Sequence, residues 1–192
     1  NMLKIGMAMG LFHYQILSEI FENIHGAAHE EDLANIVLKT ISKAFHTEAG
    51  SIFKVLEDQS VIPLASYGVA VNVLREAKFQ VGEGVVGWVA FFSKAVSVEN
   101  PQKDLRFMGR IDVLTGFKSR TILAAPIVSS GKCIGVIEFI NRKDGPFTAS
   151  DLDLVSMVGR VVGTVFENAR LIKKLEIKAA FQEAVFSSRR VQ

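Results

Sequence analysis

Cysteine is almost absent from this chain of 192 residues, which contains only Cys133. A single thiol cannot build an intrachain disulfide framework or a zinc site made of several cysteines. Cys133 lies in an apolar run, which favours a small buried side chain over a reactive thiol. Because free cysteine without disulfides is typical of reducing compartments, we expect a cytoplasmic protein.

The chain also has little net charge and no long apolar run. Its formal charge is +2, and it has no basic run beyond the SSRR near its end, so nucleic-acid binding is not indicated. No stretch reaches the roughly 18 apolar residues of a membrane span. Hydrophobic residues make up 49% of the chain, which is enough for a full core.

The hydrophobic periodicity predicts two helices, then strands, then one long helix. Residues 3–25 and 30–45 carry apolar side chains at helical spacing. Two strands joined near Asp58–Ser60 follow, and a second, clearer hairpin turns at Ser129–Lys132. A helix over about 149–186 comes last. This order predicts an α+β fold with a largely antiparallel sheet.

The stretch INRKDGPFTASDL joins the last predicted strand, which should end at Ile140, to the long helix. Thr148 and Asp151 have the spacing of a capping box, and the apolar residue before the cap can pack as a staple. Arg142 or Lys143 can reach Asp151 across the turn. So tight a corner favours a structural clamp over a catalytic pair, which would need an open cleft.

Two features indicate a place for a ligand. The glycine-opened run GEGVVG predicts a helix start, where the free N–H groups of Gly84, Val85 and Val86 would favour an anion, although a plain glycine turn explains it equally well. Glu138 interrupts the apolar strand CIGVIEFI. It is either a costly buried carboxylate or an outward-facing carboxylate at a sheet edge.

The corner sequence resembles a known motif. The matching residues, in order and spacing, are Asn141, Arg142, Phe147 and Asp151. They resemble the Asn-Lys/Arg, Phe, Asp-Glu motif of GAF domains in cyclic-nucleotide phosphodiesterases and bacterial adenylyl cyclases, with Leu152 in place of the final Glu. Further similar stretches, among them AGSIFKV, VGEGVVGWVA and VFENARL, extend the resemblance over about residues 30–171. It implies a GAF-like antiparallel sheet of about six strands, with helices packed on one face and a ligand pocket under loops on the other.

The resemblance also implies the residues of the pocket. In phosphodiesterase GAF domains that hold cyclic GMP, the positions that contact the nucleotide match Ser51, Val85, Val86, Asp112, Thr115, Ser119 and Glu138. The implied ligand is cyclic GMP or cyclic AMP, although one aromatic position is Met108 here. On composition alone, the polar residues between 112 and 119 are equally loop residues that bond their own backbone.

The long helix carries two apolar faces. A 4-3 spacing that starts at Leu154 and Val158 and continues to Phe186 is typical of a coiled coil, whereas the face that contains Val155 can lie on the sheet. We therefore expect a homodimer through the terminal helices; the alternative is a helix folded back within one chain. Trp88 and the pair Phe91-Phe92 are expected in the core.

These observations predict an N-terminal helix at 2–29, a GAF domain at 30–171 and a C-terminal signalling helix at 172–192. We expect a non-catalytic sensor that binds a small molecule and passes the change to a possible output domain. The alternatives are a dimerisation module without a ligand and, less favoured, a methionine sulfoxide reductase, which needs several cysteines. The four histidines lack metal-ligand spacing, so no metal site is expected.

Overall fold

The computed structural model describes residues 2–24, 29–68 and 71–189. Its centre is one sheet of six antiparallel strands in the order β3-β2-β1-β6-β5-β4. The strands are β1 (Thr47–Val55), β2 (Ser60–Tyr67), β3 (Phe79–Gln80), β4 (Val96–Val98), β5 (Ile122–Ser129) and β6 (Lys132–Arg142). The predicted α+β class and antiparallel sheet are confirmed.

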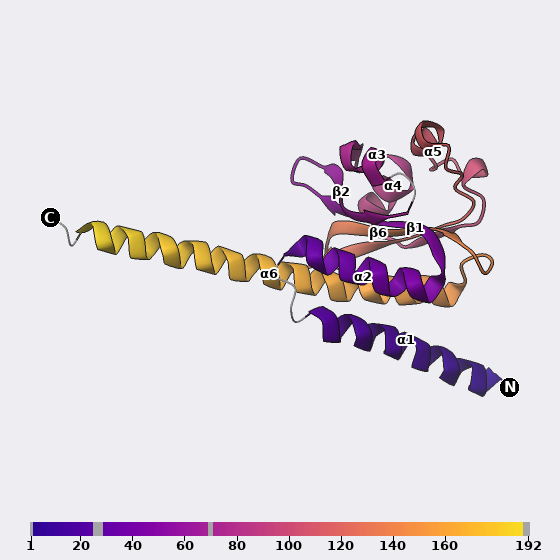
Figure 1. The fold of residues 1–192 in the computed structure, drawn as a ribbon, viewed down its shortest axis with the longest axis horizontal. Coiled ribbons are helices and arrows are strands. Elements are labelled where there is room, and N and C mark those ends of the chain that lie inside the picture. Colours follow the sequence, from indigo (N-terminus) through magenta and orange to yellow (C-terminus); the bar gives the residue numbers. More distant parts are fainter. Residues whose placement is uncertain (1, 25–28, 69–70, 190–192) are drawn as a thin grey trace.

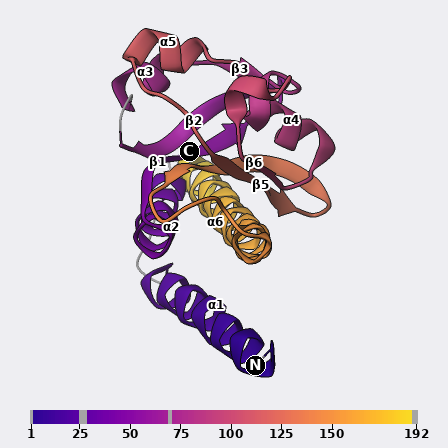
Figure 2. The ribbon, with the colours of Figure 1, turned by 90° about the vertical axis from the view of Figure 1, so that its right-hand side faces the viewer.

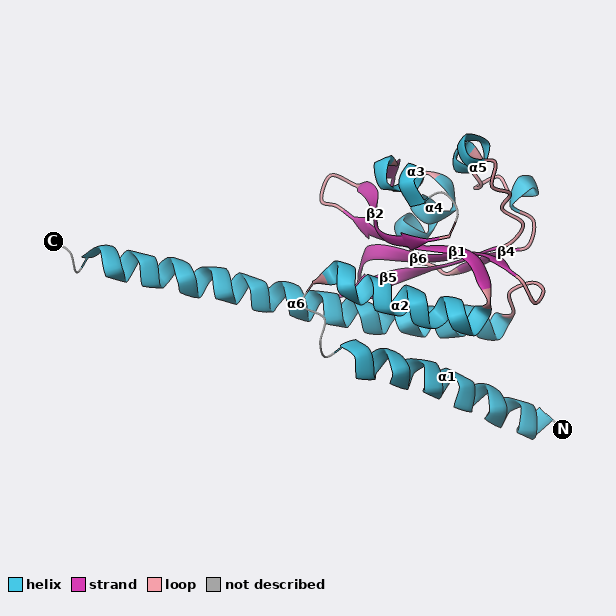
Figure 3. Ribbon diagram, in the orientation of Figure 1, coloured by secondary structure: helices cyan, strands magenta, loops and turns pink. Residues whose placement is uncertain are grey.

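Helices cover both faces of this sheet (Figures 1 and 3). The helices are α1 (Met2–Ile24), α2 (Glu30–Phe45), α3 (Val71–Glu76), α4 (Gly84–Phe92), α5 (Arg110–Thr115) and α6 (Ala149–Arg189), with a 3₁₀ turn at Pro101–Lys103. Figure 2 shows α2 and α6 side by side under one face, α1 beyond them, and α3, α4 and α5 above the other. The second face therefore carries short helices as well as the expected loops.

The strand pairing places Glu138 in the middle of the sheet. The β5–β6 hairpin turns on Ser130 and Gly131, both with positive φ, which suits the twist of a two-residue hairpin. β6 then pairs with β1 on its other side, so that Glu138 lies between Ser51 and Ala124. The alternative of an outward carboxylate on an edge strand is thereby wrong.

The face of the sheet that α2 and α6 cover is closely packed. Gly159 and Gly163 let α6 approach β5, because a Cβ at these positions would lie 2.2 Å from the Pro126 carbonyl oxygen and 2.1 Å from that of Val128. Leu154 is fully buried in this core, and so is Val158 four residues later. The first part of the predicted partner seam is therefore used within the chain, because the sheet needs both apolar faces of α6 there.

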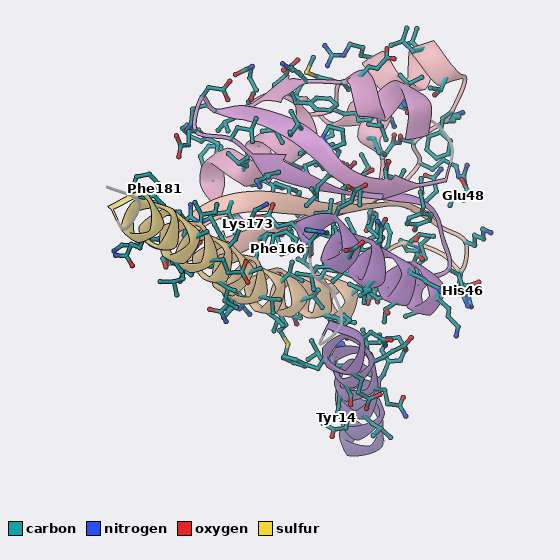
Figure 4. The ribbon with its side chains drawn as sticks, turned by 60° about the vertical axis from the view of Figure 1, so that its left-hand side comes forward. Tyr14, His46, Glu48, Phe166, Lys173 and Phe181 are labelled. Carbon is teal, nitrogen blue, oxygen red and sulfur yellow. The ribbon has the colours of Figure 1, made fainter. Side chains whose placement is uncertain are left out.

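Beyond about residue 170, α6 leaves the domain. All described side chains from Leu171 to Gln182 are exposed, and Figure 4 shows Phe181 far along the helix from Phe166, which still lies beneath the sheet. At the other end, α1 packs onto α2 and α6 through the buried Ile16 and Ile20. Among the described residues, none of the helices has the length and hydropathy needed to cross a membrane.

The corner before α6 is held by several contacts. β6 runs two residues further than expected, to Arg142, whose guanidinium forms an ion pair with Asp151. The Asp151 carboxylate accepts the Thr148 N–H (2.7 Å), and the Thr148 hydroxyl accepts the Asp151 N–H (3.2 Å), which completes a capping box. Phe147 is buried with its ring edge against Phe45.

Asn141 completes the corner in a left-handed backbone conformation, with φ of 57°. Its side-chain oxygen accepts the N–H of Arg120 (2.7 Å), and its amide donates to Glu48 (2.8 Å) and to the Lys118 carbonyl (2.9 Å). A residue in the last strand thus fixes the segment that enters β5.

Candidate functional site

A cavity of about 80 Å³ lies between the sheet and the short helices α3, α4 and α5. Apolar side chains make most of its wall, and five polar residues are gathered there: Ser51, Glu83, Asp112, Ser119 and Glu138. Four of these five were expected from the resemblance; Glu83, which stands between two glycines of GEGVVG, was missed because a residue in a turn has no periodic signal.

Glu138 forms the floor of the cavity. Its side chain comes from the centre of β6, and the residue is only 8% exposed. No described donor forms a hydrogen bond with its carboxylate. Burial raises the pKa of Glu138 to about 7, and the negative charge of Asp112 adds to the rise. A buried, unpaired carboxylate is costly, and it is the kind of group that a bound molecule can satisfy.

Asp112 faces Glu138 from α5, but its carboxylate is already bonded. It accepts the backbone N–H of Ser119 (2.7 Å) and the Ser119 hydroxyl (2.8 Å), with Gln102 at 3.4 Å. The sequence left open whether Asp112 and Ser119 bind a ligand or bond to their own loop. In the structure both residues line the cavity, and they also form hydrogen bonds with each other.

Thr115 is not brought to the cavity wall. Its hydroxyl donates to the Ile111 carbonyl (2.7 Å) and accepts the Phe117 N–H (3.2 Å), so it closes the last turn of α5. Since a hydroxyl with both roles used has little left for a guest, the structure gives Thr115 a local role in place of the expected contact.

The start of α4 faces the same cavity with free donors. Val85 and Val86 line the wall, and the first bond of the helix end runs from the Gly87 N–H to the Glu83 carbonyl (3.0 Å). Among the described residues, the N–H groups of Gly84, Val85 and Val86 have no acceptor. Three free N–H groups at the positive end of a helix dipole attract a negatively charged oxygen.

The Glu83 side chain does not cap α4. Its carboxylate accepts the Gln80 N–H (2.9 Å) and lies 3.7 Å from Arg110, whose guanidinium stacks over the Phe79 ring. The described side chains of the cavity wall include three carboxylates and no Lys, Arg or His. A bound anion therefore depends on the α4 backbone for its positive partner.

Aromatic residues complete the wall. Met108, at the position where the resemblance implies an aromatic ring, is 43% exposed and lines the cavity together with Phe107 and Phe117. A base can thus meet a ring here without an aromatic residue at 108. On the outer side of α4, Phe91 and Phe92 are 64% and 49% exposed, so their expected place in the core is wrong: α4 has nine residues, and its inward face is already taken by smaller side chains.

A second hollow, of about 470 Å³, opens between the start of α2, the hairpin turns and α6. Four of its charged residues already form ion pairs, Lys54 with Glu30 and Arg170 with Glu167. Cys133 is also there, with its thiol 3.1 Å from the Gly135 carbonyl, and burial raises the pKa of this thiol. A protonated thiol is a poor nucleophile, so this hollow has no feature that indicates catalysis.

No group of three or more metal-ligating side chains occurs within the described ranges.

The sequence matches the GAF domain family over residues 29–166. It is 31% identical over 134 residues to the dual 3',5'-cyclic-AMP and -GMP phosphodiesterase 11A of Takifugu rubripes, a match that covers 68% of this chain and 13% of that protein. It is 37% identical over 81 residues to the rod cGMP-specific 3',5'-cyclic phosphodiesterase subunit alpha of Bos taurus, covering 42% and 9%.

Solved structures agree on the fold. The GAF domain of a phosphoenolpyruvate-protein phosphotransferase from Coxiella burnetii aligns with a TM-score of 0.76 at 16% identity, covering 85% of this chain and 98% of that one. The free methionine-R-sulfoxide reductase of Neisseria meningitidis aligns with a TM-score of 0.71 at 16% identity, covering 83% and 91%. At such identities the likeness shows the fold alone.

Proposed function

This chain belongs to the GAF domain family, and we propose that it is a non-catalytic regulatory domain that binds a small molecule in the cavity over Glu138. The observation that carries the proposal is the unpaired carboxylate on the cavity floor, together with the free N–H groups of Gly84, Val85 and Val86 on its wall. The fitting guest has hydrogen-bond donors at one end and an anionic oxygen at the other.

Cyclic nucleotides are the first candidates. Their bases carry N–H donors, and their cyclic phosphate supplies the anion that a helix start prefers. The relatives that match this chain are named as cyclic-AMP and cyclic-GMP phosphodiesterases. Because the chain spans about a tenth of their length, their catalytic activity is not assigned to it. The single Cys133, with its raised pKa, argues against the reductase alternative and suits a cytoplasmic setting.

A nucleotide needs more room than this cavity offers, because its volume of about 80 Å³ is smaller than the roughly 150 Å³ of a cavity that holds benzene. The part of the wall best suited to move is α5, which has no buried residue and whose Val113 is 84% exposed. Guest entry would displace α5 outward, and contact with the guest would then order it.

A thermal-shift panel with cyclic GMP, cyclic AMP and small metabolites tests the proposal. We expect a cyclic nucleotide to raise the melting temperature of the wild type, because a ligand that binds only the folded state stabilises it. Glu138→Ala should abolish the shift while the protein stays folded. Glu99→Ala, which removes an exposed carboxylate elsewhere, is the matched control. An unchanged shift in Glu138→Ala would remove this residue from the site.

The exposed part of α6 supports a second element of the proposal, a homodimer that relays the bound state. Beyond Val165, which still packs against the core, the heptad continues through the exposed Asn168, Ile172 and Leu175. A β-branched residue at one heptad position and Leu at the other is the pairing of parallel two-stranded coiled coils, and a polar residue such as Asn168 in the seam fixes register. If no guest binds, this stripe still favours the alternative of a dimerisation module. In either case α6 leads toward any output domain.

Sedimentation equilibrium tests the seam. We expect a wild-type dimer, and a monomer for the double variant Ile172→Asp with Leu175→Asp, because two charges would enter a closed apolar seam. The matched control, Ile177→Asp with Phe181→Asp, changes equally exposed apolar residues that lie off the heptad and should remain dimeric. A monomeric wild type, or equal loss in both variants, contradicts the coiled coil.

A further inference from the structure

The side chains around Glu138 include further carboxylates and no cation. Its neighbours across the strands are Ser51 and Ala124, neither of which is charged. α5 directs Asp112 into the same cavity, and the segment before α4 contributes Glu83. Of the described side chains on this wall, none is a cation, and α3 adds only an apolar one. The side chains packed over Glu138 thus include two carboxylates and no cation, and the free N–H groups of α4 on the same wall form no hydrogen bond with Glu138 among the described residues.

The other two carboxylates of the cavity wall have hydrogen-bond partners, whereas Glu138 has none among the described residues. Asp112 accepts two hydrogen bonds from Ser119, at 2.7 and 2.8 Å. Glu83 has the Gln80 N–H and the nearby Arg110. Glu138 has neither a donor nor a cation among the described residues, so the proton that relieves the repulsion belongs on Glu138.

We propose that the empty cavity holds Glu138 as a neutral carboxylic acid near neutral pH, and that binding of cyclic GMP releases this proton to solvent. In this step the O–H bond of Glu138 breaks, and guanine N–H groups become donors to the carboxylate that remains. The neutral state of Glu138 concerns the ligand-free protein alone, whereas the release of its proton on binding rests on the proposed function. The direction agrees with the pKa of Glu138, which burial raises to about 7.

Proton release makes the affinity depend on pH. The carboxylate form of Glu138 binds the guest. Below the pKa of Glu138 in the ligand-free protein, each fall of one pH unit therefore lowers the apparent affinity about tenfold, and above this pKa the affinity is constant. Between about pH 8 and about pH 6, cyclic GMP should therefore bind about tenfold more weakly. Glu138→Gln keeps the shape but has no proton to release, so its weaker binding should not vary with pH in this range.

Carbon-13 NMR titration of the side-chain carboxyl groups tests the neutral state of Glu138 without any ligand. We expect one glutamate signal with a midpoint near pH 7, and its absence in Glu138→Gln. Asp104→Asn is the control, since hydrogen bonding to Arg106 holds the pKa of Asp104 at about 2, and its removal should leave the high-pH signal in place. The inference is overturned if every glutamate titrates in the ordinary range for that residue.

Calorimetric titration with cyclic GMP near pH 6.5, in buffers of different ionisation enthalpy, tests the release of the proton on binding. The expected result is release of about three-quarters of a proton per bound nucleotide in the wild type, which is the protonated fraction that a pKa of about 7 gives at this pH, and no release in Glu138→Gln. Binding without proton release would overturn the coupling. Absence of binding even at about pH 8 would reject both the coupling and the cyclic-nucleotide candidate, while the carboxyl titration would still decide the state of the empty site.

Discussion

Asp151 and Glu138 are both more than nine-tenths buried, but only Asp151 has hydrogen-bond and ion-pair partners among the described residues. Asp151, in the first turn of α6, forms an ion pair with the Arg142 guanidinium and accepts hydrogen bonds from the backbone N–H and the hydroxyl of Thr148. Glu138, at the cavity side, has no described partner. A paired carboxylate holds a strand to a helix, whereas an unpaired one costs stability unless something else supplies the missing bonds. The contrast supports a structural role for Asp151 and the proposed binding role for Glu138.

The faces on which they lie differ in the same way. On one face, α6 approaches β5 so closely that Gly159 and Gly163 leave no room for a Cβ. On the other face, α4 packs against the sheet through buried residues, but α5, beside the cavity, has none. A closely packed face joined to a long helix, and a cavity partly covered by an exposed helix, suit the proposed domain, which would admit a guest on one side and relay the bound state on the other.

The largest expected effect comes from breaking the paired carboxylate. Arg142→Met should cost about 3–5 kcal/mol of unfolding free energy, because it leaves Asp151 buried without its cation. Urea denaturation measures the loss. The matched variant Arg120→Met breaks the exposed pair with Glu48 and should cost at most about 1 kcal/mol. Equal losses would show that burial does not distinguish the two pairs.

The unpaired carboxylate should respond with the opposite sign. At about pH 8, Glu138→Gln should stabilise the protein by roughly 2–3 kcal/mol, since an ionised group in an apolar site is replaced by a neutral one. With its pKa raised from 4.5 to about 7, Glu138 contributes stability that is present below pH 4.5 and lost as pH rises to about 7. Denaturation across this range should show the decline in the wild type and not in the variant. A parallel decline in both would assign it elsewhere.

The helix cap gives a smaller effect. Thr148→Ala removes the hydroxyl that accepts the Asp151 N–H and should destabilise the protein by about 1 kcal/mol. The backbone N–H of Thr148 keeps its bond to Asp151, so the carboxylate remains paired. A loss as large as that of Arg142→Met would mean that the cap, and not the ion pair, holds Asp151.

The smallest effect is expected on the outer side of α4. Phe91→Ser should change the unfolding free energy by no more than about 0.5 kcal/mol, because the ring is 64% exposed. Val89→Ala, on the inward side, removes fully buried methyl groups and should cost clearly more in the same denaturation experiment. A large loss for Phe91→Ser would return this residue to the core.

Features determined by neighbouring residues could be predicted from the sequence. The hairpin at Ser130-Gly131 depends on turn residues, and the capping box at Thr148 depends on a spacing of three. These interactions close within a few residues, so the pattern contains what is needed.

Features determined by distant segments could not be predicted in this way. Glu138 lies in the middle of the sheet because β6 pairs with β1, where Glu138 is opposite Ser51. These two residues are 87 positions apart in the sequence, and no local pattern reveals such a pairing. The apolar positions Leu154 and Val158 read as a partner seam because the sequence does not show that the sheet covers them. Thr115 was assigned by resemblance, but the hydrogen bonds of one helical turn decide where its hydroxyl lies.

Calorimetric titration of cyclic GMP at about pH 8 shows whether a guest completes the cavity over Glu138. We expect saturable binding of one nucleotide per chain in the wild type and no detectable binding in Glu138→Ala. Equal binding in the two proteins would contradict the proposed role of Glu138, because the carboxylate would then take no part in holding the guest.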